Sequence, residues 1–224
     1  MFWNAEDGYY VLGGGGYAAL VVALLVALVL IGVIRGRKKD AKSRFSVKTI
    51  TFAGASIALA FVLSFVKLYH LPWGGSVTLL SMFFVVFVGY LYGPGVGFAA
   101  AFVYSILQFI QGGGGSYMLS PLQVMCDYFL AFTALGVGGF FKGKKNGLII
   151  GYILAVICRG AFHALGGYLF WMDYMPEDFF APAVYPILYN FAYLIPEMIL
   201  TVIVIILPPV KKAIDRVRNM ADQM

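Results

Sequence analysis

The sequence predicts an all-α, polytopic membrane protein, a helical bundle with a six-helix core and one extra N-terminal transmembrane helix. Three observations predict this fold class. The 224-residue chain is 62% hydrophobic and only 12% charged, with a mean hydropathy of +0.88, which excludes an ordinary soluble domain. Long apolar runs recur along it, each close to the roughly 20 residues that a helix needs to cross a bilayer. Basic residues fall in short clusters between these runs.

Seven apolar runs are candidate transmembrane helices. In chain order they cover residues 17–35, 48–69, 76–92, 96–111, 121–141, 148–171 and 184–207. The stretch "GPGVG" between the third and fourth runs predicts a tight turn, so these two helices are expected to be antiparallel. A polar, basic segment separates the first run from the others, and the first run is therefore expected to be an accessory helix.

The chain is expected to divide into three parts. Residues 1–46 hold the accessory helix and a basic cytoplasmic linker, residues 47–210 form the six-helix membrane domain, and residues 211–224 form a basic cytoplasmic tail. A signal peptide begins with positive charge, whereas Glu6 and Asp7 precede the first apolar run and the basic cluster follows it. The first helix is therefore expected to be retained.

The basic residues also predict an orientation. They gather at 35–48, 142–145 and 211–218, and with seven spans all three segments fall on one side of the membrane. The opposite loops hold glycine, proline and acidic residues instead. We therefore expect the N-terminus outside and the C-terminus in the cytoplasm. The net charge of +6 reflects this topology rather than binding to nucleic acid.

Small residues are spaced four apart on the second span, where Gly54 precedes Ala58 and Ser56 precedes Ala60. Such spacing lets two helix backbones approach closely in a membrane, where packing replaces the hydrophobic effect as the driving force. The pattern fits a docking face for another membrane subunit and fits packing within the bundle equally well.

Ionisable residues inside the spans are few, and because a charge at the bilayer centre costs on the order of 2.5–3.5 kcal/mol, each is a candidate functional residue. They are Asp127, Arg159, His163 and Glu197. A helical rise of about 1.5 Å per residue places Asp127 and His163, together with Asn190, in an outer layer. The same rise places Arg159 and Glu197 in a deeper layer.

Two arrangements of these charges stay open. In the first, Arg159 and Glu197 form a buried ion pair, and Asp127 has no fixed cation because His163 is neutral. A cationic ligand from outside would then stabilise the ionised Asp127. In the second, Arg159 reaches Asp127, and Glu197 is protonated or faces a water-filled gap. A third reading makes all four charges structural. Tyr and Trp side chains near the outer layer could stack on a flat, positively charged solute.

Motifs for other chemistry are missing from the sequence. It has no His-Glu-x-x-His helix, no Gly-x-Ser-x-Gly turn and no phosphate-binding loop, since neither "GGGG" run is followed by Lys-Ser or Lys-Thr. His163 and Asp127 alone are too few to ligate a metal. We therefore expect no enzyme activity, no metal and no cofactor, and uphill transport would need an external source of energy.

Three stretches, "SYMLSPLQVMCDYFLAFTALGVGGF", "CRGAFHALGGYLFW" and "YPILYNFAYLIPE", resemble the thiamine-binding S component of energy-coupling factor (ECF) transporters. The resemblance covers roughly residues 47–207. It implies a six-helix bundle with an outward-facing thiamine pocket in a bacterial plasma membrane, associated with a transmembrane coupling subunit and two ATPases. The substrate-binding residues that it implies are Trp73, Tyr117, Asp127, Tyr128, Arg159, His163, Trp171, Tyr185 and Asn190.

Two of these positions depart from the family pattern. Asp127 stands where the family usually has Glu, and Arg159 stands where it can have Lys, so both keep their charge but alter reach and geometry. The sequence predicts high-affinity thiamine binding and uptake as an S component. The alternatives are an S component for another vitamin or pyrimidine, a stand-alone proton-coupled carrier with Asp127 or Glu197 as its proton site, and a membrane protein with a merely packed interior.

Overall fold

The computed structural model describes residues 3–6, 9–12, 45–112, 118–174 and 183–222. Five helical segments in it are long and apolar enough to cross a membrane. They are Val47–Ser64, Pro94–Gln111, Pro121–Phe141, Gly147–Tyr174 and Tyr185–Ile206, and a shorter apolar helix spans Ser81–Tyr92. The predicted all-α membrane bundle is confirmed. The first candidate span, 17–35, lies outside the described residues, so the extra N-terminal helix stays a prediction.

Two of the spanning helices, α3 (Val47–Ser64) and α5 (Pro94–Gln111), flank the shorter α4 (Ser81–Tyr92) in the chain. The tight turn predicted between α4 and α5 is present, because Gly93 with a φ of +89° ends one helix and Pro94 begins the next. A Cβ built on Gly97 would lie 2.7 Å from the Cα of Gly89. Only glycine therefore allows these two backbones to come so close.

The prediction that a helix continues to residue 69 and another begins at residue 76 is wrong. Instead, β3 (Lys67–His70) pairs antiparallel with β4 (Ser76–Thr78) around a short turn at Pro72–Gly74. Pro72 has no backbone N–H to donate, and Gly74 has a φ of +97°, so both residues favour a turn. A second hairpin joins β1 (Trp3–Glu6) to β2 (Tyr9–Leu12) near the N-terminus.

The remaining two spans change helix type along their length. One consists of α6 (Pro121–Val124), a π-helical segment η2 (Met125–Leu130), α7 (Ala131–Thr133) and the 3₁₀ segment η3 (Ala134–Phe141). The other consists of α8 (Gly147–Gly166), a π-helical segment η4 (Gly167–Trp171) and η5 (Met172–Tyr174). Single π-helical turns are uncommon and are frequent at functional sites. These two segments therefore mark a candidate functional region.

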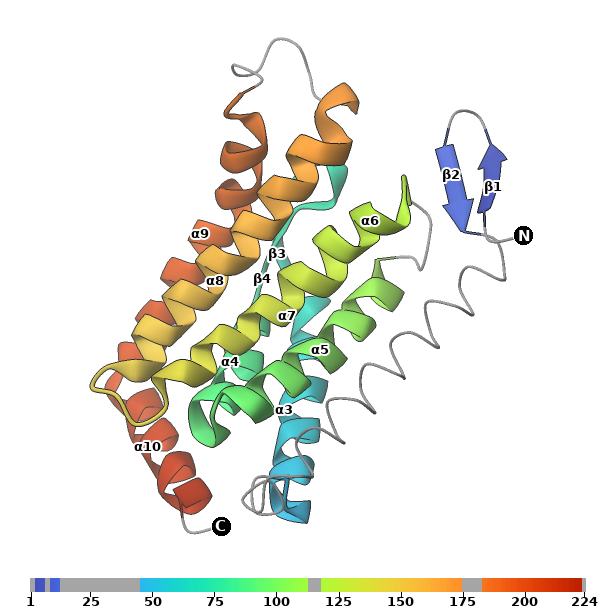
Figure 1. Cartoon of the computed structure of the whole chain (residues 1–224). Helices are drawn as coiled ribbons and strands as arrows, with labels where there is room; N and C mark the ends of the chain where they lie inside the picture. The colour runs from blue at the N-terminus through green and yellow to red at the C-terminus, as the bar shows by residue number, and fades with distance from the viewer. Residues whose placement is uncertain (1–2, 7–8, 13–44, 113–117, 175–182, 223–224) are drawn as a thin grey trace.

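The C-terminal part comprises α9 (Tyr185–Ile206) and α10 (Pro208–Asp222). In Figure 1, α9 lies beside α8, and α10 lies at the same end of the bundle as the turn that joins η3 to α8. The segment expected to be a tail is thus helical, and its residues Ile214, Val217 and Ala221 pack against the hydrophobic core. Large apolar side chains such as Val62 are exposed on the outer surface of the bundle, which suits contact with lipid.

Candidate functional site

Asp127 lies in η2, near the N-terminal end of its span. This helix begins at Ser120, whose hydroxyl oxygen accepts a hydrogen bond from the backbone N–H of Gln123 at 3.1 Å, and Pro121 occupies the first turn. Both features are typical helix starts. The cap fixes where the helix begins and therefore which face carries Asp127.

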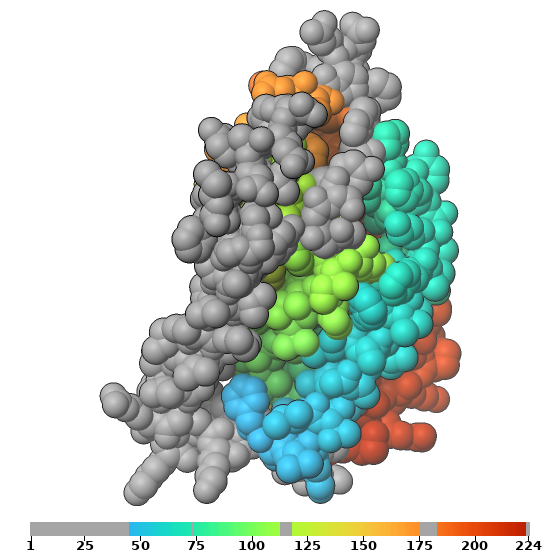
Figure 2. All heavy atoms as spheres, turned by 90° about the vertical axis from the view of Figure 1, so that its right-hand side faces the viewer, coloured from blue at the N-terminus to red at the C-terminus, as the bar shows by residue number. Residues whose placement is uncertain are grey.

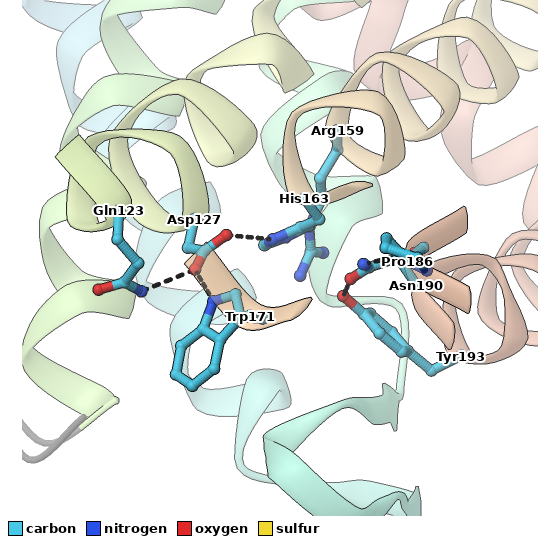
Figure 3. A network of polar contacts seen from close by, with 8 residues as sticks. All are labelled: Gln123, Asp127, Arg159, His163, Trp171, Pro186, Asn190 and Tyr193. Carbon is cyan, nitrogen blue, oxygen red and sulfur yellow. Dashed lines mark hydrogen bonds and ion pairs between the residues drawn. The ribbon is translucent and has the colours of Figure 1, made fainter. Parts of the chain in front are cut away.

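Three side chains surround the carboxylate of Asp127, as Figure 3 shows. Its Oδ2 accepts one hydrogen bond from Nε2 of Gln123 at 2.7 Å and another from Nε1 of Trp171 at 2.8 Å. Its Oδ1 lies 3.8 Å from Nδ1 of His163. The Asp127 side chain is 14% exposed and the His163 side chain 11% exposed. The charge is therefore held largely out of water but is not sealed off.

The approach of α8 to Asp127 depends on glycine. A Cβ built on Gly166 would lie 2.3 Å from Oδ1 of Asp127, so a larger residue would displace the carboxylate. The π-helical segment η4 begins directly after Gly166 and ends at Trp171. Two π-helical segments thus meet, with Asp127 supplied by one and Trp171 by the other.

Arg159 lies one turn from His163 on the same face of α8, and its Nε–H donates to Nε2 of His163 at 3.3 Å. The guanidinium carbon lies 4.1 Å from the centre of the Phe132 ring, a cation–π geometry. The Phe132 ring also meets the imidazole edge to face, with ring centres 5.9 Å apart. One aromatic side chain therefore supports both residues.

A second polar group lies on α9, across from the Asp127 group in Figure 3. Asn190 donates from Nδ2 to the carbonyl of Pro186 at 2.8 Å and accepts at Oδ1 from the Tyr193 hydroxyl at 2.7 Å. The ring of Tyr193 lies 6.4 Å from the ring of His163, which connects the two groups. The outer layer expected from helical rise is therefore a set of neighbouring side chains.

The deeper layer differs from the expected ion pair. The carboxylate of Glu197 accepts hydrogen bonds from the backbone N–H and hydroxyl of Thr78, at 3.0 and 2.7 Å, and from the hydroxyl of Ser81 at 3.2 Å. Among the described residues, no ion pair joins Arg159 to Glu197 or to Asp127. Neutral donors satisfy the 1% exposed Glu197, and neither predicted pairing of Arg159 is formed.

The other sequence-predicted residues make different contacts or lie outside the described part. Tyr128 packs edge to face on Phe109, with ring centres 5.4 Å apart. Tyr185 is buried and stacks on Tyr189 at 6.0 Å. Tyr117 and the side chain of Trp73 lie outside what the structure describes.

The small residues of α3 separate into two groups. Gly54 and Ala58 are exposed, and a Cβ built on Gly54 would meet no atom of a described residue within 4 Å. Ser56 and Ala60 are buried, so they serve packing within the bundle. Figure 2 shows α3 and the β3–β4 hairpin above it on one face of the molecule. Packing within the bundle accounts for Ser56 and Ala60, and docking on another subunit stays a prediction for Gly54 and Ala58.

Sequence reasoning missed Gln123, Phe132 and Tyr193, which hold the predicted residues in place. A signal for Gln123 was present, because Ser120-x-x-Gln123 is a capping box and Gln123 precedes Asp127 by one helical turn. Its Oε1 accepts from the backbone N–H of Leu119 at 3.4 Å, while its Nε2 reaches Asp127. Phe132 and Tyr193 lie in apolar stretches of the sequence, where they look like ordinary core aromatics.

This arrangement offers binding rather than bond-breaking chemistry. No group of three or more His, Cys, Asp or Glu side chains that could hold a metal occurs among the described residues. The site instead combines a carboxylate, amide and phenol groups, and aromatic rings. Such a set suits a small, flat solute with a positive charge and hydrogen-bonding edges.

Comparison with known proteins gives a consistent result. Residues 50–215 match the profile of a family described as thiamine transporter protein (Thia_YuaJ). The chain is 27% identical to the thiamine transporter ThiT of Bacillus subtilis over 151 residues, which cover 61% of this chain and 76% of that one. It is 32% identical to ThiT of Lacticaseibacillus paracasei over 120 residues, 47% of this chain and 59% of that one.

A solved structure of ThiT from Listeria monocytogenes resembles this fold with a TM-score of 0.59 and 23% identity. The match covers 71% of this chain and 91% of that one. These proteins are transporters rather than enzymes, which confirms the prediction that the chain is not an enzyme.

Proposed function

This chain belongs to the thiamine transporter family, and from that membership we propose that it binds thiamine within the membrane and takes part in its uptake. It is a multi-pass membrane protein. Thiamine carries a permanent positive charge on its thiazolium ring and hydrogen-bonding groups on its aminopyrimidine ring. The proposal requires a negative charge, flat faces and polar edges within one site.

The placement of Asp127 is the observation that carries the proposal. Its side chain is only 14% exposed, and among the described residues no Lys or Arg pairs with it. A cation beside a carboxylate in such a place is stabilised several times more than it is in water. We assign Asp127 the role of counter-charge to the thiazolium.

Flat faces and polar edges surround this charge. Trp171 meets Asp127 through its indole N–H, and we assign its ring the role of stacking on a ring of the vitamin. Asn190 uses one amide hydrogen and accepts one hydrogen bond, so one donor and one acceptor position remain for the vitamin. We place Tyr185 with Asn190 as a hydrogen-bonding group, and we place Tyr117, Tyr128 and Trp73 at the periphery of the site.

The finer part of the proposal concerns energy and partners. We infer that the chain is the S component of an ECF-type transporter, and that the exposed face of α3 with Gly54 and Ala58 docks on a coupling subunit energised by two ATPases. The open space around Gly54 supports this reading, as does the lack of a phosphate-binding loop in the sequence. We place α10 and Lys142–Lys145 in the cytoplasm and the accessory helix of residues 1–46 apart from residues 47–210.

Titration of the purified full-length chain with thiamine tests the binding proposal. Because the chain has only three tryptophans, saturable quenching at micromolar or lower thiamine is expected to depend on Trp171. A Trp171→Phe variant should lose most of the signal, whereas a Trp3→Phe variant should keep it. Absence of quenching in the unaltered chain would refute the proposal.

Transport assays test the coupling. A Gly54→Leu variant is expected to bind thiamine normally but to lose uptake in cells, because it blocks the face of α3 without touching the Asp127 group. Uptake into liposomes that contain this chain alone would contradict the S-component assignment and favour a proton-coupled carrier. The Glu197 contacts with Thr78 and Ser81 give that carrier no support, since they anchor the carboxylate to neutral donors.

A further inference from the structure

The hydrogen bond between Arg159 and His163 fixes where the imidazole carries its proton. A guanidinium has donors but no acceptor, so Nε2 of His163 must accept from Nε–H of Arg159 and is itself unprotonated. The other ring nitrogen, Nδ1, lies 3.8 Å from Oδ1 of Asp127. The geometry therefore corresponds to a neutral imidazole that bears its proton on Nδ1 and points it toward Asp127.

Arg159 is held in this position by groups that do not compete for Asp127. Its guanidinium lies over the Phe132 ring, 4.1 Å from the ring centre. Phe132 is only 6% exposed and also touches His163 edge to face. Arg159 is half-buried, and by donating to the imidazole it places a fixed positive charge next to it, which opposes protonation of that ring.

We propose that Arg159 is a positioning residue, which keeps His163 neutral with its proton on Nδ1 so that the charge of Asp127 stays available to a cationic ligand. The proposal rests on the proposed thiamine-binding function of this site. It changes the role that the family resemblance gave to Arg159, from a contact with the vitamin to a contact with His163.

A neutral His163 matters for binding because a protonated His163 and a cationic ligand would compete for the carboxylate of Asp127. A protonated His163 would pair with Asp127, and a ligand cation would then have to displace that pair. The groups that face His163 are Asp127 from η2, Arg159 from its own helix, Phe132 from α7 and Tyr193 from α9. Arg159 is the only cation among them, so its removal takes away the charge that disfavours protonation.

Nitrogen-15 NMR of the purified full-length chain tests the tautomer without any ligand. The chain has only two histidines, and exposed His70 on β3 serves as an internal reference for the signals. His163, assigned by its loss in His163→Asn, is expected to show a protonated Nδ1 and an unprotonated Nε2 from pH 8 to pH 5.5. A proton on Nε2, or an imidazolium in this range, would overturn the proposal.

The pH dependence of thiamine affinity tests the consequence. In the unaltered chain Kd is expected to stay constant from pH 8 to pH 5.5. In Arg159→Met it is expected to rise as the pH falls, by up to tenfold for each pH unit once His163 takes up a proton, because the charge that opposes this protonation is gone. Arg159→Lys retains a cation and a donor and should restore the flat profile.

A second substitution separates positioning from ligand contact. Asn in place of His163 cannot protonate, so adding Arg159→Met to His163→Asn should introduce no pH dependence. An Arg159→Met variant that loses affinity equally at every pH would overturn the positioning role. If the unaltered chain binds no thiamine at any pH, the proposed function fails, and the NMR measurement alone decides the tautomer.

Discussion

Replacement of Asp127 by Asn removes the charge of the site and keeps its shape, and its effect on affinity can be calculated in advance. With a thiazolium about 5 Å from the carboxylate and an effective dielectric constant of about 20, the lost attraction is about 3 kcal/mol. This corresponds to a roughly 200-fold rise in Kd. If the site behaved like water, the same pair would contribute below about 1 kcal/mol, or roughly fourfold. The 14% exposure of Asp127 favours the larger value.

The variant is expected to fold, because the Asn carbonyl oxygen can accept from Gln123 and Trp171 as Oδ2 does. Fluorescence or calorimetric titration in detergent measures Kd, and Asp173→Asn on η5 is a matched control, since Asp173 is exposed. The uncharged aminopyrimidine half of thiamine provides a second control, because its affinity should fall far less. A Kd for thiamine within about fivefold of the unaltered chain would refute the counter-charge role.

Three further changes test the support of the site and of the fold. Gln123→Leu should raise the Kd for thiamine about tenfold, because Asp127 loses a buried hydrogen bond worth about 1.5 kcal/mol; an unchanged Kd would show that Gln123 is not needed. Gly166→Ala should weaken binding at least as much, since a Cβ would lie 2.3 Å from Oδ1 of Asp127, and normal affinity would mean that α8 adjusts freely. Glu197→Leu removes the acceptor of three hydrogen bonds, after which the hydroxyls of Thr78 and Ser81 keep only the bond to each other; the midpoint of thermal unfolding should fall, with an expected cost of about 1–3 kcal/mol. Glu197→Gln should have a smaller effect, and equal midpoints for the two variants would contradict the hydrogen-bonding role.

The fold was predictable wherever hydropathy decides it. A helix that faces lipid needs a long apolar run, and such runs appear in the sequence whatever the tertiary contacts are. The wrong prediction of helix at residues 67–78 arose where hydropathy does not decide the structure. Apolar residues such as Leu68 and Val77 continue the hydropathic signal there, but Pro72 and a Gly74 with φ of +97° turn the chain back into a hairpin. Hydropathy alone does not distinguish these two outcomes.

The sequence predicted the depth of the site residues in the membrane but not their hydrogen-bonding partners. Asp127, His163 and Asn190 share a layer because helical rise is regular. The partners of Glu197 were not predictable, because Thr78 ends the hairpin that hydropathy missed and Ser81 begins the helix that follows it. The π-helical segments in η2 and η4 likewise rotate side chains by amounts that a 3.6-residue period does not contain.

The buried charges as a set say more about the ligand than any single contact does. Asp127 and Glu197 are carboxylates, Arg159 is a cation, and the hydrogen bond from Arg159 keeps His163 neutral. With both carboxylates ionised, these groups leave one uncompensated negative charge in the bundle interior. Glu197 has neutral donors on both oxygens, whereas Asp127 is the more exposed of the two carboxylates. A ligand with a single positive charge would neutralise the set at Asp127, whereas an anionic solute would increase the imbalance. With this charge count a cationic ligand is favoured over an anionic one, and thiamine meets that condition.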